Sequence, residues 1–299
     1  MTSHQDPAFQ DPAFDVLEPA RLVSPLVFNS PHSGRAYPPA FLAASRLDAR
    51  KLRRSEDSHV DALFVCAAEF GAPLLRAHFP RAWLDVNREP FELDPRMFEG
   101  RLPSFANTRS LRVAGGLGTI PRLVGDAQEI YACKLNVAEA LERIERVYRP
   151  YHRALERLVA RAEARFGLAI LVDCHSMPSG RAGASEEARQ RADFVLGDRY
   201  ATSAAPAIVD CVDYELRRRG YAVHRNKPYA GGFITEHYGN PRAGRHALQI
   251  EINRALYMNE ETFERLPGFD GVADDLRGAV DALASLAHGA MAQGRLAAE

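Results

Sequence analysis

The chain has 299 residues, and its 38 Lys and Arg against 39 Asp and Glu leave a formal net charge of −1. This balance provides no global field for nucleic acid or an acidic membrane surface, so neither is an expected partner. The four cysteines lie far apart without a C-x-x-C pair, which suits a reduced cytoplasmic compartment. The opening residues lack the pattern of a secretory signal, and no apolar run is long enough to span a membrane.

Residues 1–20 are expected to form a flexible leader without a catalytic role. They contain a small tandem duplication, Asp-Pro-Ala-Phe at 6–9 and again at 11–14. Its prolines and low complexity are typical of mobile segments. The remaining residues, 21–299, show no internal linker, so we predict that they form a single domain.

Short apolar runs that predict buried strands alternate with patterns that predict helices. The expected strands, in chain order, are 22–28, 73–79, 82–86, 168–174, 193–196, 221–224 and 247–252. The expected helices are 59–70, a helical region at 127–166 that Pro150 breaks, 207–220 and 272–293. This alternation predicts an α/β fold with a mixed, mostly parallel sheet flanked by helices on both faces.

Polar side chains lie at or near the ends of four of the expected strands. In α/β sheets, binding sites gather outside the carboxyl ends of strands. The segments found there are Pro31-His32-Ser33-Gly34, Asp85-Val86-Asn87-Arg88, Asp173-Cys174-His175-Ser176 and Gln249-Ile250-Glu251-Ile252-Asn253. Three long segments without periodicity, 87–126, 176–192 and 226–245, are of a length that is usually functional in a compact domain.

His32 and His175 are the expected metal ligands because each follows a strand and precedes a turn of small residues. A catalytic zinc commonly takes two His and one carboxylate and leaves a fourth position for water. A single His at a strand end is more often a cap or a core hydrogen-bonding group, and the paired placement weakens that alternative. For the carboxylate we favour Asp57, with Glu56 as the substitute, although both also suit the cap of the following helix.

Glu251 is the expected general base. It is a single acid within an apolar strand pattern, and burying an unpaired carboxylate there is costly. Hydrolysis needs such a base to take a proton from water and pass it to the leaving nitrogen. The alternative is a structural ion pair with a nearby arginine.

Arg81 and Arg88 are candidates for stabilising negative charge. A fixed cation beside the metal would stabilise the developing oxyanion. Arg88, next to the amide of Asn87, could also hold a substrate carboxylate through its planar guanidinium. Arginines are common in this sequence, so their spacing alone is weak evidence.

Other chemistries fit the sequence poorly. Cys174 and His175 are adjacent on a strand and point to opposite faces, so they do not form a catalytic pair. Ser33 and Ser176 lack a nucleophile-elbow pattern. The glycine-rich segment at 115–118 has neither the ending of a phosphate-binding loop nor a strand before it.

Five motifs resemble the N-formylglutamate amidohydrolase family. They are Asn29-Ser30-Pro31-His32-Ser33-Gly34, Asp85-Val86-Asn87-Arg88-Glu89-Pro90, Asp173-Cys174-His175-Ser176, the segment Gly231 to Gly239, and the segment His246 to Arg254 followed by Leu256-Tyr257-Met258. They occur in order from about residue 23 to 260, so the resemblance covers most of the chain.

The family is similar in fold to zinc carboxypeptidases and aspartoacylases, which implies a three-layer, phosphorylase/hydrolase-like architecture. The resemblance implies His32 and His175 as metal ligands and Glu251 as general base. It implies that Arg81 polarises the scissile carbonyl and that Asn87 and Arg88 hold a substrate carboxylate. In the carboxypeptidases an acidic ligand lies three residues after the first His, where this chain has Arg35. The segment from Gly231 to Arg245 is similar to the family's substrate loop, with His237, Tyr238 and Arg242 as possible contacts.

The expected function is metal-dependent hydrolysis of N-formyl-L-glutamate to formate and glutamate, which in the family serves histidine degradation. The expected cofactor is one divalent ion, Zn²⁺ before Co²⁺ or Fe²⁺. The expected partner is a small N-acyl amino acid, and the chain is expected to be a monomer or small homo-oligomer. The alternatives are a deacylase or carboxypeptidase-like enzyme with another substrate, and a non-catalytic protein that binds carboxylates.

Overall fold

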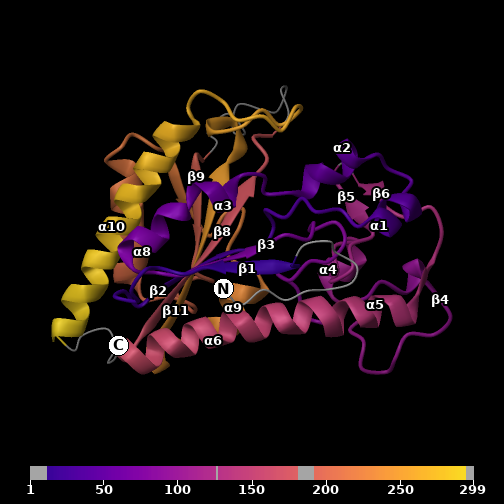
Figure 1. Ribbon diagram of the computed structural model, residues 1–299, viewed down its shortest axis with the longest axis horizontal. Helices are drawn as coiled ribbons and strands as arrows, with labels where there is room; N and C mark the ends of the chain where they lie inside the picture. The colour runs from indigo at the N-terminus through magenta and orange to yellow at the C-terminus, as the bar shows by residue number, and fades with distance from the viewer. Residues whose placement is uncertain (1–11, 126, 181–191, 294–299) are drawn as a thin grey trace. The chain divides into compact units, whose positions relative to one another are not determined.

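A computed structural model describes residues 12–125, 127–180 and 192–293 (Figure 1). Within these residues, the chain divides into two compact units: the first comprises 12–16, 31–58 and 75–155, and the second 17–30, 59–74 and 156–293. The single domain expected from the sequence stays a prediction. No helix in the described part of the chain is both long and apolar enough to cross a membrane.

The second unit is built on a mixed sheet. Its strands follow the order β2 (Leu26–Ser30), β8 (Ala169–Met177), β11 (Arg245–Asn253), β9 (Phe194–Gly197) and β10 (Val223–Arg225). Strands β2, β8 and β11 are parallel, β9 is antiparallel to β11, and β10 is parallel to β9. The mixed, mostly parallel sheet predicted from the sequence is therefore confirmed.

The two faces of this sheet differ, because its two longest strands are apolar on one face and carry the polar groups of the site on the other. Ile170, Val172 and Cys174 of β8 pack with alternate residues of β11 into a core that includes side chains of α3 (Val60–Leu63), α8 (Pro206–Arg217) and α10 (Phe269–Gln293). Helices α8 and α10 lie side by side (Figure 1). The short helix α9 (Phe233–Tyr238) lies against β11 and β8. In the turn before it, the backbone amide of Gly232 donates a hydrogen bond to the side chain of Gln249 on the polar face of the sheet.

The first unit contains most of β1 (Phe14–Leu17) and β3 (Leu74–Ala77). These strands are hydrogen-bonded neighbours, and Arg76 of β3 donates two hydrogen bonds to the Asp15 carboxylate of β1. Shorter elements make up the rest: α1 (Pro39–Ala44), α2 (Ala49–Leu52), β4 (Phe98–Glu99) paired with β7 (Leu135–Asn136), α4 (Leu111–Ala114), β5 (Leu123–Val124) paired with β6 (Gln128–Glu129), and α5 (Val137–Arg143).

Pro150 does not break the long helix into two. Helix α5 continues through the π-helical turn η4 (Ile144–Tyr148) into α6 (Arg149–Phe166). In the π turn the Arg149 amide bonds to the Ile144 carbonyl, five residues back. A proline inside an α-helix lacks a donor and crowds the carbonyl four residues before it, and the wider turn accommodates this. The helical region begins at Val137, not at 127.

Three other predictions differ from the structure. Residues 82–86 form no strand: the Trp83 and Leu84 amides both bond to the Pro80 carbonyl, so the backbone turns there although its apolar side chains are buried. The helix expected at 59–70 is α3 followed by the 3-10 helix η2 (Val65–Phe70). Strand β1 lies within the predicted leader, whose residues 1–11 are outside the described residues. Burial alone cannot distinguish a short strand from a turn.

The other 3-10 helices are short and connect longer elements. They are η1 (Arg53–Ser55), η3 (Pro95–Met97), η5 (Pro241–Ala243) and η6 (Arg254–Leu256). Two of them matter for the site, because η1 precedes Asp57 and η6 follows the end of β11.

Candidate functional site

The polar face of the sheet carries two rows of functional groups. In the first row Asn29, Asp173 and Gln249 are neighbours in register on β2, β8 and β11. In the second row, two residues further along, His175 lies opposite Glu251. Side chains two positions apart on a strand share a face, so the first row can support the second.

Asp173 holds the ring of His175. The Nε2 atom of His175 lies 2.8 Å from Oδ2 of Asp173, and the Asn29 amide donates to Oδ1 of the same carboxylate over 2.7 Å. Because the carboxylate accepts, Nε2 carries the hydrogen and the lone pair of the neutral ring is on Nδ1. A metal-binding histidine is usually held in this way by a carboxylate on its other nitrogen.

His32 is held by the same kind of contact, made over a longer stretch of chain. Its Nε2 atom lies 2.8 Å from Oδ1 of Asp85, and its Nδ1 lies 3.4 Å from Oδ2 of Asp57. His32 and Asp57 are each only 1% exposed. The Nδ1 atom of His32 therefore faces a buried carboxylate.

Asp85 is in turn surrounded by donors. Oδ1 also accepts the Asn87 amide over 2.9 Å, and Oδ2 accepts Nε of Arg81 over 2.9 Å and lies 3.4 Å from a terminal nitrogen of Arg88. Burial opposes ionisation of this carboxyl, but the two guanidinium groups and the imidazole outweigh it and hold the pKa of Asp85 well below its usual range. Asp85 therefore stays a carboxylate that can accept from His32.

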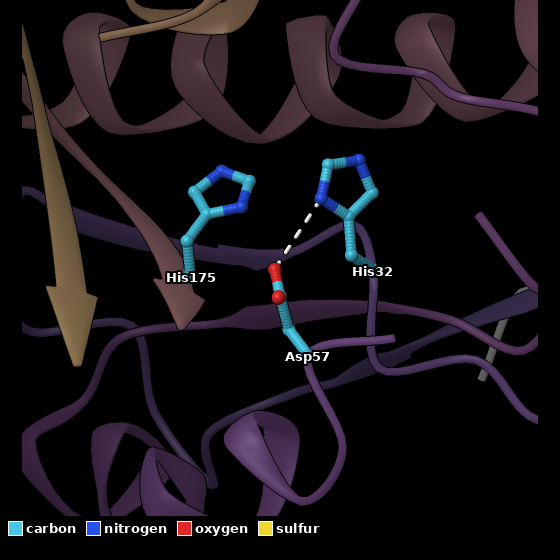
Figure 2. A group of neighbouring side chains, drawn as sticks. All are labelled: His32, Asp57 and His175. Atoms are coloured by element: carbon cyan, nitrogen blue, oxygen red, sulfur yellow. Dashed lines mark ion pairs between the residues drawn. The ribbon is translucent and has the colours of Figure 1, made fainter. Parts of the chain in front are cut away.

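His32, Asp57 and His175 form a buried group whose ligand atoms all lie within 4.8 Å of one another (Figure 2). The set offers two imidazoles, each with its Nε2 bonded to an aspartate, and one carboxylate. Two histidines and one carboxylate are a common ligand set of catalytic zinc. The group could therefore hold a divalent metal ion, as expected from the sequence.

Glu56, the substitute ligand, is engaged elsewhere. Its carboxylate accepts hydrogen bonds from the Tyr37 hydroxyl over 2.6 Å, from Nε of Arg53 over 3.1 Å and from the Ser58 hydroxyl over 2.7 Å. These contacts occupy both oxygens. Of the two neighbouring acids, Asp57 is the one that faces His32.

Glu251 lies in the polar face beside His175 and is 7% exposed. Its Oε1 accepts a hydrogen bond of 2.8 Å from the Gln249 amide. A buried carboxylate is costly unless it is hydrogen-bonded or used, so this placement suits a base next to a metal ligand. Its role as the base stays a prediction.

Arg88 is bound closely by the protein itself. Its guanidinium donates to the carbonyls of Leu117 over 2.6 Å and Asn87 over 2.7 Å, besides its approach to Asp85. Burial lowers the pKa of Arg88 to about 10, although Asp85 opposes this shift. Arg81 is more accessible, with 27% of its side chain exposed. Both arginines are thus brought to Asp85, and their predicted substrate contacts remain predictions.

The three residues predicted as contacts in the substrate loop are not brought to the strand end that carries Glu251. Helix α9 starts where Gly232 bonds to Gln249 and ends near Asn240, which pairs with Arg245 at the start of β11. It therefore runs away from Glu251, which lies about 20 Å further along the strand than Arg245. His237 and Arg242 are exposed, and Tyr238 is buried near the carboxylate of Glu156.

Cys174 is no nucleophile. Its side chain is in the core on the other face of the sheet, and burial raises the pKa of its thiol well above the usual range. A thiolate is the reactive form of cysteine. The rejection of a Cys-His pair on the strand is therefore consistent with its placement.

The family model described as N-formylglutamate amidohydrolase matches residues 24–258. This chain belongs to that family. The match confirms the resemblance carried by the five motifs, while the more distant relation to zinc carboxypeptidases stays a prediction.

Two N-formylglutamate deformylases are similar to this chain along most of their length. The N-formylglutamate deformylase of Pseudomonas aeruginosa is 32% identical over 240 residues, covering 79% of this chain and 83% of the relative. The N-formylglutamate deformylase of Pseudomonas putida is 27% identical over 239 residues, covering 79% and 82%. The match extends well beyond isolated motifs.

Solved structures share the fold. The N-formylglutamate amidohydrolase of Ralstonia eutropha JMP134 has a TM-score of 0.84 and 39% identity, covering 94% of this chain and 99% of that one. The Atu2144 gene product of Agrobacterium tumefaciens, with a TM-score of 0.64 and 20% identity, shares the fold alone. The α/β fold predicted from the sequence is that of the family.

Sequence reasoning assigned no role to the two aspartates that hold the histidines in this family member. Asp173 lies two residues before His175 on one strand, and that spacing alone places both on one face. Asp85 carried no comparable signal, because 53 residues separate it from His32. Only the fold brings these two side chains together.

Proposed function

We propose that this chain hydrolyses the formyl C–N bond of N-formyl-L-glutamate and releases formate and L-glutamate. The observation that carries the proposal is the family match over residues 24–258. The Pseudomonas relatives bear the name of this activity, and the similarity to the Pseudomonas aeruginosa protein covers 79% of the chain. The buried group of His32, Asp57 and His175 supports a metal-assisted version of the reaction.

His32, Asp57 and His175 would hold the divalent ion, with Asp85 and Asp173 fixing the two imidazole rings. When bound, zinc or a similar ion supplies a Lewis acid for the formyl oxygen and lowers the pKa of water. Zn²⁺ is the proposed ion, since two histidines and one carboxylate are a common zinc ligand set. Co²⁺ and Fe²⁺ are alternatives, because ligand type alone does not select among these ions.

Glu251 would move the proton. Its carboxylate takes a proton from the attacking water and delivers it to the nitrogen of the leaving glutamate. Three observations support this role: Glu251 lies beside His175, it is nearly buried, and one of its oxygens is held by Gln249.

Arg81 and Arg88 would provide the positive charge for an anionic substrate. N-formyl-glutamate carries two carboxylates, and a guanidinium binds a carboxylate through two parallel hydrogen bonds. Arg81 is the more accessible of the two, while Arg88 adds charge from a buried position. Asn87, whose backbone amide is bonded to Asp85, is proposed to lie at the same substrate end.

Substrate profiling tests the proposed reaction. The purified chain is assayed for formate release from N-formyl-L-glutamate and from N-formyl derivatives of uncharged amino acids, and for glutamate release from N-acetyl-L-glutamate and short peptides. We expect the highest kcat/KM for N-formyl-L-glutamate. A higher value for an N-acetyl substrate or a peptide would replace the proposal by a deacylase or a carboxypeptidase-like activity.

Glu251→Gln tests the proton step. The amide keeps the shape of the side chain but cannot accept the proton, so we expect kcat to fall about 10²- to 10⁴-fold while the metal content stays unchanged. Glu215→Gln is the matched control, because it neutralises a nearly buried glutamate of α8 that is bonded to Arg218 and Arg219. Activity within twofold of wild type in Glu251→Gln would remove Glu251 from the mechanism.

A further inference from the structure

Gln249 joins Glu251 to the turn that precedes helix α9. Its Nε2 donates to Oε1 of Glu251 over 2.8 Å, and its Oε1 accepts the backbone amide of Gly232 over 2.9 Å. Gln249 is 4% exposed, so both contacts are made away from water. Hydrogen bonds that are buried and involve a charged group are among the stronger ones in proteins.

Only one orientation of the Gln249 amide satisfies both neighbours. The backbone amide of Gly232 can only donate, and the ionised carboxylate of Glu251 can only accept. A rotation of the amide by 180° would place donor against donor and acceptor against acceptor. Each contact therefore fixes the direction of the other, and Oε1 of Glu251 is held toward Gln249.

The turn at 230–232 is seated directly on the sheet next to Gln249. Gly197 of β9 is the register partner of Gln249, and a Cβ at Gly197 would lie 2.7 Å from the backbone of Ala230. The Arg199 amide donates to the Ala230 carbonyl over 2.8 Å. A side chain at position 197 would thus lift the turn away from Gln249.

The turn is also fixed from the side of helix α9. The hydroxyl of Thr235 donates to the Gly232 carbonyl over 2.9 Å. Gly231 has a φ of +117°, which L side chains rarely adopt. The backbone amide of Gly232 is thus presented to Gln249 by a turn that is hydrogen-bonded to helix α9.

We propose that Gln249 is a positioning residue, which holds the carboxylate of Glu251 and fastens the turn at 230–232 to it. This inference rests on the proposed function, in which Glu251 is the base. The same arrangement holds the neighbouring ligand, since Asp173 fixes His175 two residues further along β8. Gln249 and Asp173 are register partners and would play parallel parts for proton transfer and for metal binding.

Two variants separate the two contacts of Gln249. Gln249→Met keeps the length of the side chain and loses both contacts, whereas Gln249→Glu keeps an acceptor for Gly232 and sets a second carboxyl group against Glu251, where the two acids would share one proton and Glu251 would be a poorer base. We expect kcat to fall about 10- to 100-fold in both variants, with KM changed by less than about threefold. Metal content should equal that of wild type in both.

Hydrogen exchange gives a readout that does not depend on activity. The Gly232 amide should exchange at least about tenfold faster in Gln249→Met and at the wild-type rate in Gln249→Glu, because only the former loses the acceptor. Thr235→Val is the matched control. It loosens the same turn without touching Glu251, so its kcat should stay within about threefold of wild type. A loss in Thr235→Val equal to that in Gln249→Met would overturn the contact with Glu251 as the cause.

A double-mutant cycle tests the route of the effect. If Gln249 acts through Glu251, then Gln249→Met should lower the residual kcat of Glu251→Gln by less than about twofold. The inference would be overturned if the kcat loss of the double variant equalled the product of the two single losses. Unchanged exchange of the Gly232 amide in Gln249→Met would also overturn it.

The two proposals fail in different ways. If wild type releases no formate from N-formyl-L-glutamate, the proposed function fails. The inference about Gln249 is then decided by the exchange of Gly232 and by the same cycle measured on the equilibrium constant of unfolding. Additive effects of Gln249→Met and Glu251→Gln on that constant would overturn it.

Discussion

The two histidines of the candidate metal site are held by the same contact, but the chain builds it in two different ways. His175 is held by Asp173, two residues earlier on β8, and the pleat of the strand alone places the two side chains on one face. His32 is held by Asp85, which lies 53 residues away in a loop. One support is local, and the other depends on the tertiary fold.

The two aspartates also differ in the donors that surround them. Asp173 accepts from His175 and from the amide of Asn29, which is a neutral donor. Asp85 accepts from His32, from a backbone amide and from two arginines. Asp85 is therefore the counter-ion of buried positive charge as well as the support of a ligand, so the two aspartates should respond differently to the same substitution.

The largest effect is expected from removing a ligand, and here the two histidines should behave alike. His32→Ala and His175→Ala each delete one of three protein ligands, so we expect the bound metal to fall below about a tenth of an equivalent and kcat to fall at least about 10³-fold. Metal analysis after gel filtration and formate release measure the two losses. Retention of a full equivalent of metal in either variant would exclude that histidine as a ligand.

The second-largest effect is on the free energy of unfolding, and it distinguishes Asp85 from Asp173. Asp85→Asn leaves the buried guanidinium of Arg88 and that of Arg81 without their counter-ion, and we expect a loss of about 3 kcal/mol in the free energy of unfolding. Asp173→Asn keeps an acceptor for Asn29 and should cost about 1 kcal/mol. Urea denaturation of the metal-free proteins measures both. Equal losses would contradict the distinction between the two aspartates.

Metal affinity should fall by a similar factor in both variants. An asparagine no longer fixes the imidazole as a charged acceptor does, and loss of such a support costs about 10- to 100-fold in metal affinity. Competition with a chromophoric chelator gives the dissociation constants. An unchanged constant in Asp85→Asn would mean that His32 is oriented by other contacts.

The smallest effect is expected from Glu56, the acid next to Asp57. Glu56→Gln should leave one equivalent of metal bound, because its carboxylate is occupied by Tyr37, Arg53 and Ser58, and it should destabilise the fold by about 1 kcal/mol. Asp57→Asn is the matched variant and should lose the metal. The opposite result would make Glu56 the ligand.

The strands of the second unit were predictable because their chemistry is local. Apolar runs flanked by turns gave β2, β8, β9, β10 and β11 to within a few residues, and polar residues at strand ends pointed to His32, His175 and Glu251. The group formed by His32, Asp57 and His175 was likewise anticipated.

The remaining features depend on contacts that no local pattern contains. The buried segment 82–86 has the composition of a strand, yet bonds to the Pro80 carbonyl turn it. Pro150 has the composition of a helix breaker, yet a π turn accommodates it. The position of α9 also depends on such contacts. The loop that contains it was predicted to be functional, but the direction of the helix carries His237 away from Glu251 and leaves Gly232 beside Gln249.

A metal titration with formate release tests the central claim most directly. The purified chain is stripped with a chelator and titrated with Zn²⁺ while hydrolysis of N-formyl-L-glutamate is followed, with Asp57→Asn measured in parallel. We predict no activity in the stripped protein, a linear rise to full activity that ends at one equivalent, and no recovery in Asp57→Asn. Full activity in the stripped protein, with no metal bound, would contradict the account.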